Sequence, residues 1–214
     1  MKVVLADDHR MMRDGLRAVL ERAGVEVVGE AANGHEAIAE VKRLRPEVLV
    51  VDITMPELNG IDATRRITAE LPGIKVIALS MNSDRRYVIA MLEAGAAGYL
   101  LKNSASDELL NALAVVTRGQ TYLSPAIAGS VVEQAVGRAP SWRREAERPL
   151  SVREREVLQL IAEGKSSKGI AATLEIAVTT VETHRRQIMD KLNLRTVAEL
   201  TKYAIREGLT SAEG

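Results

Sequence analysis

The sequence predicts a doubly wound α/β domain with a five-stranded parallel sheet, followed by a small all-α domain. In the first 120 of the 214 residues, short apolar segments alternate with segments of helical spacing. From Leu150 onward only helical patterns are present. A chain of this length is typical of two ordinary domains. We therefore expect domains at residues 1–120 and 150–214, joined by a linker helix and flexible linker at 121–149.

Five short segments rich in Val, Ile and Leu predict the strands, because such runs are typical of strands buried on both faces of a parallel sheet. They are Val3–Ala6, Val25–Gly29, Val48–Val51, Ile74–Leu79 and Gly98–Leu101. A helical pattern follows each strand, which implies right-handed crossovers. A ligand site is then expected at the carboxyl ends of the strands.

The linker prediction depends on two consecutive segments. Pro125–Val136 is amphipathic and predicts one more helix. Gly137–Pro149 contains two Pro, one Gly and many charges without apolar periodicity, which is typical of a flexible linker. Trp142, the only Trp, either packs across a domain interface or is a half-exposed linker residue.

Composition excludes several classes of protein. The chain has no Cys, so it has no disulfide framework and no thiolate metal site. Its start lacks the pattern of a signal peptide, and its apolar runs are much shorter than the ~20 residues that cross a bilayer. We therefore expect a cytoplasmic protein with no membrane partner.

Charge is distributed unevenly between the two halves. Residues 1–137 carry 15 Lys and Arg against 18 Asp and Glu, a net charge of −3, and residues 138–214 carry 14 against 11, a net charge of +3. A basic second half favours binding to nucleic acid.

Three carboxylates follow strands that are expected to be neighbours in the sheet. Asp7 and Asp8 follow the first strand, and Asp52 follows the third. Converging carboxylates are unfavourable without a cation, and Mg²⁺ prefers a few carboxylates plus water. Ser80 ends the fourth strand and Lys102 follows the fifth. A metal, a carboxylate nucleophile, a hydroxyl and an ammonium together can accept a phosphoryl group.

The strings LADDH, VVDITMPELNGID, VIALS and AGAAGYLLK resemble the receiver domain of bacterial two-component systems, which has a flavodoxin-like sheet. The resemblance spans about residues 1–120. It implies that Asp52 is the phosphoacceptor and that Mg²⁺ binds Asp7, Asp8, Asp52 and the backbone carbonyl of Thr54.

The same resemblance implies a switch. Ser80 would hydrogen-bond the phosphoryl group, Lys102 would pair with it, and Tyr99 would change rotamer as Ser80 moves. Phosphorylation adds about −1.5 to −2 charge, which can bias a bistable loop and aromatic side chain. The alternative for Tyr99 is an ordinary, half-buried strand residue.

The second half contains helix signals in series. Ser151 and Glu154 form a capping box, and Gly164 is placed as a left-handed helix end. A short helix at Ile170–Leu174, a turn, and a longer basic helix at Thr179–Leu192 predict a helix-turn-helix, whose second helix enters the major groove. Periodicity alone also permits a plain helical bundle.

The strings LSVREREVLQLIAEGKSSKGIA and TVETHRRQIMDKLNL resemble the LuxR-type domain of the NarL/FixJ class of regulators, over about residues 148–212. By position, the residues facing base edges would be Glu182, Thr183 and Arg186. The candidates for DNA phosphates would be Lys165, Thr179, Thr180, Arg185 and Lys191. The last helix, Val197–Glu207, resembles the family's dimerisation helix, which implies a homodimer on paired half-sites.

This half departs from its family in two helix starts. Ser167 and Gly169 stand where Asn and Glu are usual, so Ser166 lacks a capping-box partner. Ala177 replaces the usual Ser at the N-cap of the recognition helix, a loss of about 0.5–2 kcal/mol.

Together the resemblances imply a two-component response regulator. A sensor histidine kinase would phosphorylate Asp52, which would control dimerisation and sequence-specific binding to double-stranded DNA, and so transcription. The protein would not be an enzyme beyond Mg²⁺-dependent phosphoryl acceptance and slow self-dephosphorylation.

Two other functions are compatible with parts of this pattern. An aspartate-nucleophile phosphohydrolase also uses Mg²⁺, Lys and Ser, but it usually has a second Asp where this chain has Thr54, and no substrate-capping insertion is present. The other function is that of a regulator in one of two versions: the first is independent of phosphorylation, and the second binds protein instead of DNA. The complete pocket argues against the first version and TVETHRR against the second.

Overall fold

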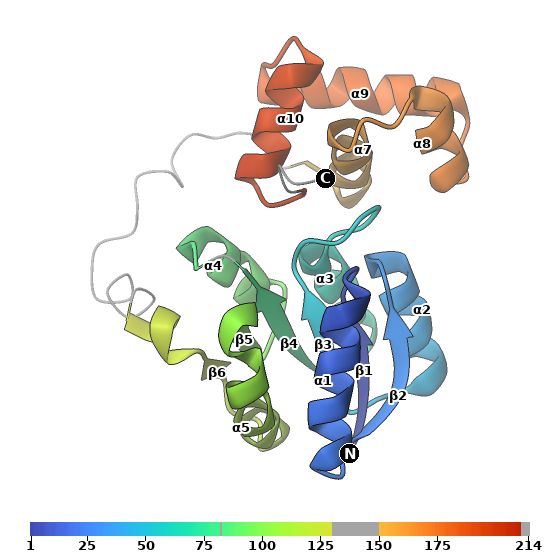
Figure 1. Cartoon of the computed structure of the whole chain (residues 1–214). Coiled ribbons are helices and arrows are strands. Elements are labelled where there is room, and N and C mark those ends of the chain that lie inside the picture. Colours follow the sequence, from blue (N-terminus) through green and yellow to red (C-terminus); the bar gives the residue numbers. More distant parts are fainter. Residues whose placement is uncertain (82, 130–149, 211–214) are drawn as a thin grey trace. The chain divides into compact units, whose positions relative to one another are not determined.

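The computed structural model describes residues 1–81, 83–129 and 150–210 (Figure 1). The chain divides into two compact units, Met1–Arg138 and Ala139–Gly214. Helix is present at residues 125–129, while the rest of the predicted helix and the whole linker with Trp142 lie outside the described residues. In the described ranges, none of the helices is both long and apolar enough to cross a membrane.

The first unit is built on a parallel sheet with the strand order β2-β1-β3-β4-β5-β6. The strands are β1 (Lys2–Ala6), β2 (Glu26–Ala31), β3 (Val48–Asp52), β4 (Lys75–Ser80), β5 (Gly98–Leu101) and β6 (Tyr122–Leu123). All five predicted strands are present, one of them with its predicted bounds and the others with ends shifted by at most two residues. The two-residue β6 was not predicted because it is too short to have a detectable period.

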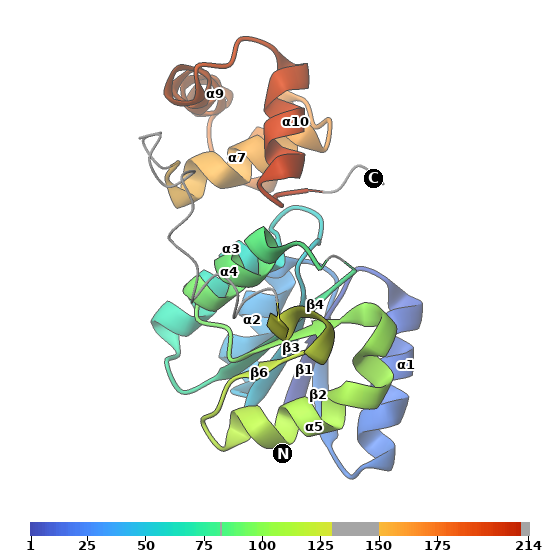
Figure 2. The same ribbon diagram turned by 90° about the vertical axis from the view of Figure 1, so that its left-hand side faces the viewer.

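Helices cover both faces of this sheet (Figures 1 and 2). α1 (Arg10–Arg22) and α5 (Ala105–Thr117) pack on one face, with Val48 and Val50 of β3 in their core. α2 (Gly34–Leu44), α3 (Gly60–Glu70) and α4 (Arg85–Glu93) pack on the other, with Leu49 and Val51. Successive strand residues point to opposite faces, so both sides of β3 are apolar and buried.

The second unit is helical throughout its described part. It contains α7 (Val152–Ala162), α8 (Ser167–Thr173), α9 (Val178–Leu192) and α10 (Val197–Arg206). Val181, Ile188 and Leu192 of α9 join one apolar core, as their spacing predicts. The unit is therefore a small all-α domain.

Several helix ends in this unit follow local sequence signals. The predicted capping box of Ser151 and Glu154 is confirmed, and Gly164 has a φ of +78° just after α7. Ser166 caps α8 through the amide of Gly169, while Ala177 provides no side-chain cap to α9.

Candidate functional site

The candidate site lies at the carboxyl ends of four adjacent strands. Asp7 follows β1, Asp52 ends β3, Ser80 ends β4, and Lys102 follows β5 in the short helix η1 (Lys102–Ser104). Because the strands are parallel and adjacent, residues that are far apart in sequence meet at this edge.

Four potential metal ligands converge there. One ligand atom from each of Asp7, Asp8, His9 and Asp52 lies within 4.8 Å of the others. His9 Nδ1 lies 3.3 Å from Asp7 Oδ1 and 2.8 Å from Asp8 Oδ1. Sequence reasoning missed His9, although its position directly after Asp8 was the available signal.

Lys102 joins the two buried carboxylates. Its Nζ lies 2.6 Å from Asp52 Oδ2 and 2.8 Å from Asp7 Oδ2, and the Lys102 and Asp52 side chains are each 5% exposed. Burial raises the pKa of Asp52 to about 6; the charge of Lys102 opposes this shift and that of Asp7 adds to it. Burial alone would lower the pKa of Lys102, but the two carboxylates outweigh it and raise that pKa.

The pocket fits a hard divalent cation. Asp7 Oδ2 is buried and, apart from its ion pair with Lys102, accepts no well-oriented hydrogen bond from the described residues. One ammonium cannot balance the three carboxylates of Asp7, Asp8 and Asp52, and Asp8 is partly open to solvent. Carboxylate oxygens with room for water are the ligands that Mg²⁺ prefers.

The loop after β3 closes tightly against Asp52. The Thr54 amide donates to Asp52 Oδ1 at 3.2 Å, and the Gly60 amide donates to the Ile53 carbonyl at 2.8 Å. A Cβ on Gly60 would lie 2.0 Å from the Asp52 carbonyl oxygen, so this position requires glycine. The loop thereby holds the carboxylate and the backbone that follows it.

Tyr99 is fully buried, so the half-buried alternative is wrong. It belongs to β5, next to β4, where Ala78 is its partner and Ser80 lies two residues further on. Its phenol hydrogen-bonds the side chain of Ser80, and burial raises the pKa of Tyr99 to about 12. The hydroxyl at the end of β4 is therefore joined to the aromatic ring in the sheet.

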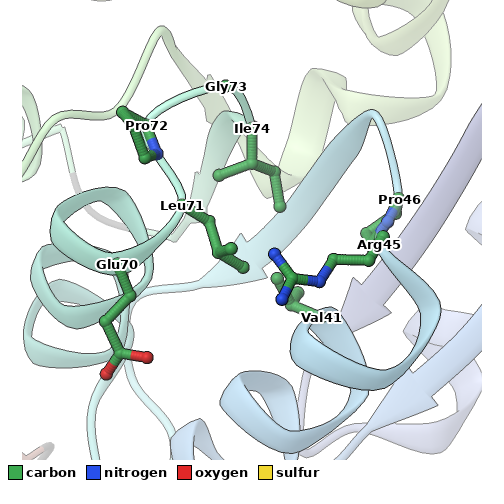
Figure 3. A pocket seen from close by; sticks show the side chains of 8 residues that line it. All are labelled: Val41, Arg45, Pro46, Glu70, Leu71, Pro72, Gly73 and Ile74. Atoms are coloured by element: carbon green, nitrogen blue, oxygen red, sulfur yellow. The ribbon is translucent and has the colours of Figure 1, made fainter.

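A separate pocket lies near the amino ends of β3 and β4, away from the carboxyl-end site. This pocket of about 400 Å³ is lined by α2 and by the segments before β3 and β4, including Pro46 and Ile74 (Figure 3). Glu70 at its rim is 2.7 Å from Lys42 in an ion pair. Because its lining is mainly apolar and its one carboxylate is paired, this pocket lacks the chemistry of the strand-end site.

The predicted DNA-contacting residues lie on α9 and just before α8. Thr179, Thr180, Glu182, Thr183 and Arg186 are exposed, whereas Lys165, Arg185 and Lys191 are partly buried.

Four of these side chains already have partners within the domain, and one of them is Lys165, whose Nζ donates to Thr173 Oγ1 at 3.5 Å. Lys191 Nζ is 2.7 Å from Glu154 Oε2, and Thr183 Oγ1 donates to the Thr179 carbonyl at 2.9 Å. Glu182 accepts a short hydrogen bond from the Ser167 hydroxyl, which connects α9 to α8. The contacts of Lys191 and Glu182 join residues whose distance depends on folding, so sequence reasoning could not find them, whereas the Thr183 bond lies within one helix.

Comparisons with known proteins identify the family of each of the two domains. Residues 3–114 match the family described as response regulator receiver domain, and residues 148–204 match the family described as bacterial regulatory proteins, luxR family. The oxygen regulatory protein NreC of Staphylococcus carnosus is 40% identical over 214 residues, covering 98% of this chain and 99% of that protein. The transcriptional regulatory protein MctR of Rhizobium johnstonii is 39% identical, covering 100% and 97%.

Solved structures are similar over nearly the whole chain or over about two thirds of it. RcsB from Salmonella enterica serovar Typhimurium, bound to promoter P1flhDC in the presence of the phosphomimetic BeF3-, aligns with a TM-score of 0.60 and 29% identity, covering 98% of this chain and 99% of that one. A two-component response regulator of the LuxR family from Aurantimonas sp. SI85-9A1 aligns with a TM-score of 0.61 and 34% identity, covering 64% and 98%. The chain belongs to the two-component response regulators that carry a receiver domain and a LuxR-type DNA-binding domain.

Proposed function

We propose that Asp52 accepts a phosphoryl group from the phosphohistidine of a sensor kinase. The observation that carries this proposal is the position of Lys102 Nζ, within 2.8 Å of both Asp52 Oδ2 and Asp7 Oδ2. With a pKa of about 6, the Asp52 carboxyl is mainly ionised above pH 7 and can act as a nucleophile.

In the reaction, an oxygen of Asp52 attacks the phosphorus, an O–P bond forms, and the N–P bond to the leaving imidazole breaks. Lys102 is placed to move from Asp52 to a phosphoryl oxygen and neutralise its charge. We infer that Asp7, Asp8, Asp52 and the carbonyl of Thr54 hold Mg²⁺, which when bound would neutralise further charge on the transferring group.

Ser80 and Tyr99 then change conformation in response to the new charge on Asp52. We infer that the Ser80 hydroxyl leaves Tyr99 to donate to the phosphoryl group, and that the ring changes rotamer in response. The buried hydrogen bond between them supports this, because losing it removes one of the interactions that hold the ring in its present rotamer. A local charge thereby changes the packing beside β4 and β5.

The output is sequence-specific binding to double-stranded DNA as a homodimer, by which the protein regulates transcription. Exposed Glu182, Thr183 and Arg186 suit base edges, and Lys165, Thr179, Thr180, Arg185 and Lys191 suit phosphates. Lys191 would have to leave Glu154 to do so. A solved structure of the similar RcsB contains two dimers bound to two parallel DNAs, which supports the same arrangement here.

We place the functional boundaries at a receiver of residues 1–120, a linker of 121–149 and a DNA-binding domain of 150–214. The two family matches, to residues 3–114 and 148–204, support this division. Because both the DNA and the kinase's phosphohistidine are in the bacterial cytoplasm, we place the protein there.

The test measures phosphorylation, oligomer size and DNA binding of the full chain. Wild type is incubated with Mg²⁺ and acetyl phosphate, analysed by intact mass and light scattering, and offered a random-sequence duplex library. We expect one added phosphoryl group, a dimer and enriched sequences, all lost in Asp52→Ala and kept in Asp14→Ala, which changes an exposed carboxylate of α1. Failure of wild type to gain a phosphoryl group from acetyl phosphate or a phosphorylated kinase would refute the proposal.

A further inference from the structure

Two arginines of α1 share one carboxylate of β2, that of Glu30, which pairs with Leu5 of β1 two residues before Asp7. Arg13 Nε donates to Glu30 Oε2 at 3.1 Å, and Arg17 donates to Glu30 Oε1 from Nε at 2.9 Å and from Nη2 at 2.6 Å. Burial opposes ionisation of Glu30, but the hydrogen bonds from Arg17 and Arg13 outweigh it and lower its pKa. The shared carboxylate is thus held as an anion between two cations.

The two arginines differ in where their remaining nitrogens bind. Arg13 Nη1 donates to the backbone carbonyl of Asp7 at 2.5 Å, and its side chain is 14% exposed. Arg17 Nη1 instead donates to Glu21 at 3.2 Å and to the Val27 carbonyl at 3.5 Å. Arg13 therefore contacts the acidic pocket, and Arg17 does not.

Asp7 is held at each of its other polar groups. Its amide donates to the Ala31 carbonyl at 3.1 Å, Oδ1 accepts from the His9 amide at 2.9 Å, and Oδ2 lies against Lys102. The Asp7 carbonyl accepts no backbone amide from the described residues, so the Arg13 guanidinium satisfies it. Arg13 completes the set of bonds that fixes this residue.

We propose that Arg13 is a positioning residue for divalent cation binding at Asp7. It acts through the backbone, by holding the turn between β1 and α1 in the geometry that aims the Asp7 carboxylate. Partners of metal ligands typically change metal affinity 10- to 100-fold when they are removed. The inference rests on the proposed function, because it assumes that the pocket binds Mg²⁺.

Electrostatics alone predicts the opposite sign. Arg13 is a cation close to the pocket, so its removal would strengthen the attraction for Mg²⁺ if charge were its only role. A positioning role predicts weaker binding in spite of the lost positive charge. The direction of the change therefore decides between the two roles.

The experiment compares Arg13→Gln with Arg17→Gln in the full chain. Both remove one cation from α1 and one partner from Glu30, but only Arg13→Gln removes the bond to Asp7. By calorimetric titration with MgCl₂, we expect the Mg²⁺ Kd to rise about tenfold in Arg13→Gln and to stay within about twofold in Arg17→Gln. With acetyl phosphate, the half-saturating Mg²⁺ concentration should rise in parallel, while the rate at saturating Mg²⁺ stays within about threefold.

A second variant guards against misfolding. Arg13→Lys keeps the charge but replaces the forked guanidinium with a single ammonium that cannot serve both acceptors, and it should lose several-fold in Mg²⁺ affinity. Unchanged or tighter Mg²⁺ binding in either Arg13 variant would overturn the inference, as would equal losses in Arg13→Gln and Arg17→Gln. If wild type itself bound no Mg²⁺, the proposed metal site would fail and this inference with it.

Discussion

Each domain contains a Lys–carboxylate pair of nearly the same length, yet the two carboxyl groups respond in opposite ways. Lys102 lies 2.6 Å from Asp52 in the receiver, and Lys191 lies 2.7 Å from Glu154 in the helical domain. The pKa of Asp52 is raised to about 6, whereas that of Glu154 is lowered. Contact distance alone therefore does not decide the ionisation of a buried carboxyl.

The difference lies in the other partners of each carboxylate. Burial opposes ionisation of Glu154, but Lys191 and the amide of Ser151, which donates at 2.7 Å, outweigh it. Asp52 has to share its lysine with Asp7, and the second carboxylate repels it. In the helical domain, the partners of Glu154 balance its charge, and the pair stabilises a helix start. In the receiver, one lysine faces two carboxylates. The uncompensated negative charge that remains can bind a metal ion.

The largest expected effect is on the rate of phosphorylation, when the lysine of the receiver pair is replaced and the lysine of the helical pair serves as control. We expect Lys102→Gln to slow phosphorylation of Asp52 by about 10²-fold, because a charge that stabilises the transferring oxygens is lost. Lys191→Gln should leave that rate within about twofold. Rates are measured by intact mass with acetyl phosphate at saturating Mg²⁺. Equal rates in Lys102→Gln and wild type would show that Lys102 does not assist phosphorylation of Asp52.

The second effect is a pH dependence of stability, measured with EDTA. Because folding raises the pKa of Asp52 from 3.8 to about 6, the folded protein binds the proton more tightly, and stability from this group is lost as pH rises from about 4 to about 6. Asp52→Asn does not titrate, so its stability advantage over wild type should grow from pH 4 to pH 7, by up to about 3 kcal/mol.

Calorimetric unfolding of the receiver at pH 4, 5, 6 and 7 tests this sign. Asp14→Asn is the matched control, since Asp14 is an exposed carboxylate on α1 of the same domain. An advantage of Asp52→Asn that is constant with pH, or that shrinks as pH rises, would mean that Asp52 is better compensated than its contacts indicate.

Breaking the pair between Lys191 and Glu154 should destabilise the helical domain, whereas neutralising Asp52 should stabilise the receiver at neutral pH. Glu154→Gln leaves Lys191 without its partner and weakens the capping box, so we expect the helical domain to lose about 2 kcal/mol at pH 7. Ser151→Ala removes the cap alone and should cost about 1 kcal/mol. Chemical unfolding of the two variants gives both values, and a Glu154→Gln domain as stable as wild type would show that the pair contributes nothing.

The smallest effect concerns the missing cap of the recognition helix. Ala177 precedes α9 without a side-chain hydrogen bond, whereas Ser166 caps α8 through its hydroxyl. Ala177→Ser should stabilise the helical domain by about 1 kcal/mol, with a rise of several degrees in its Tm. Ser166→Ala is the converse variant and should lower Tm; no rise in Ala177→Ser would show that this helix start is already satisfied.

Much of the fold could be predicted because its signals are local. The alternation of apolar runs and helical spacing predicts the five long strands, and single residues such as Ser151 and Gly164 predict where a helix begins or ends. β6 and the exact strand ends could not be predicted, because two-residue pairings depend on the neighbouring strand.

The sequence by itself determined which chemical groups are available to the receiver site: the carboxylates after β1 and at the end of β3, the hydroxyl at the end of β4 and the ammonium after β5. Only the tertiary structure decided how they share charge. It placed Lys102 between Asp52 and Asp7, Arg13 on the Asp7 carbonyl, and Lys191 on Glu154. The physical reason is that ionisation depends on burial and on all charges within a few ångströms, and folding sets those distances between residues far apart in the chain.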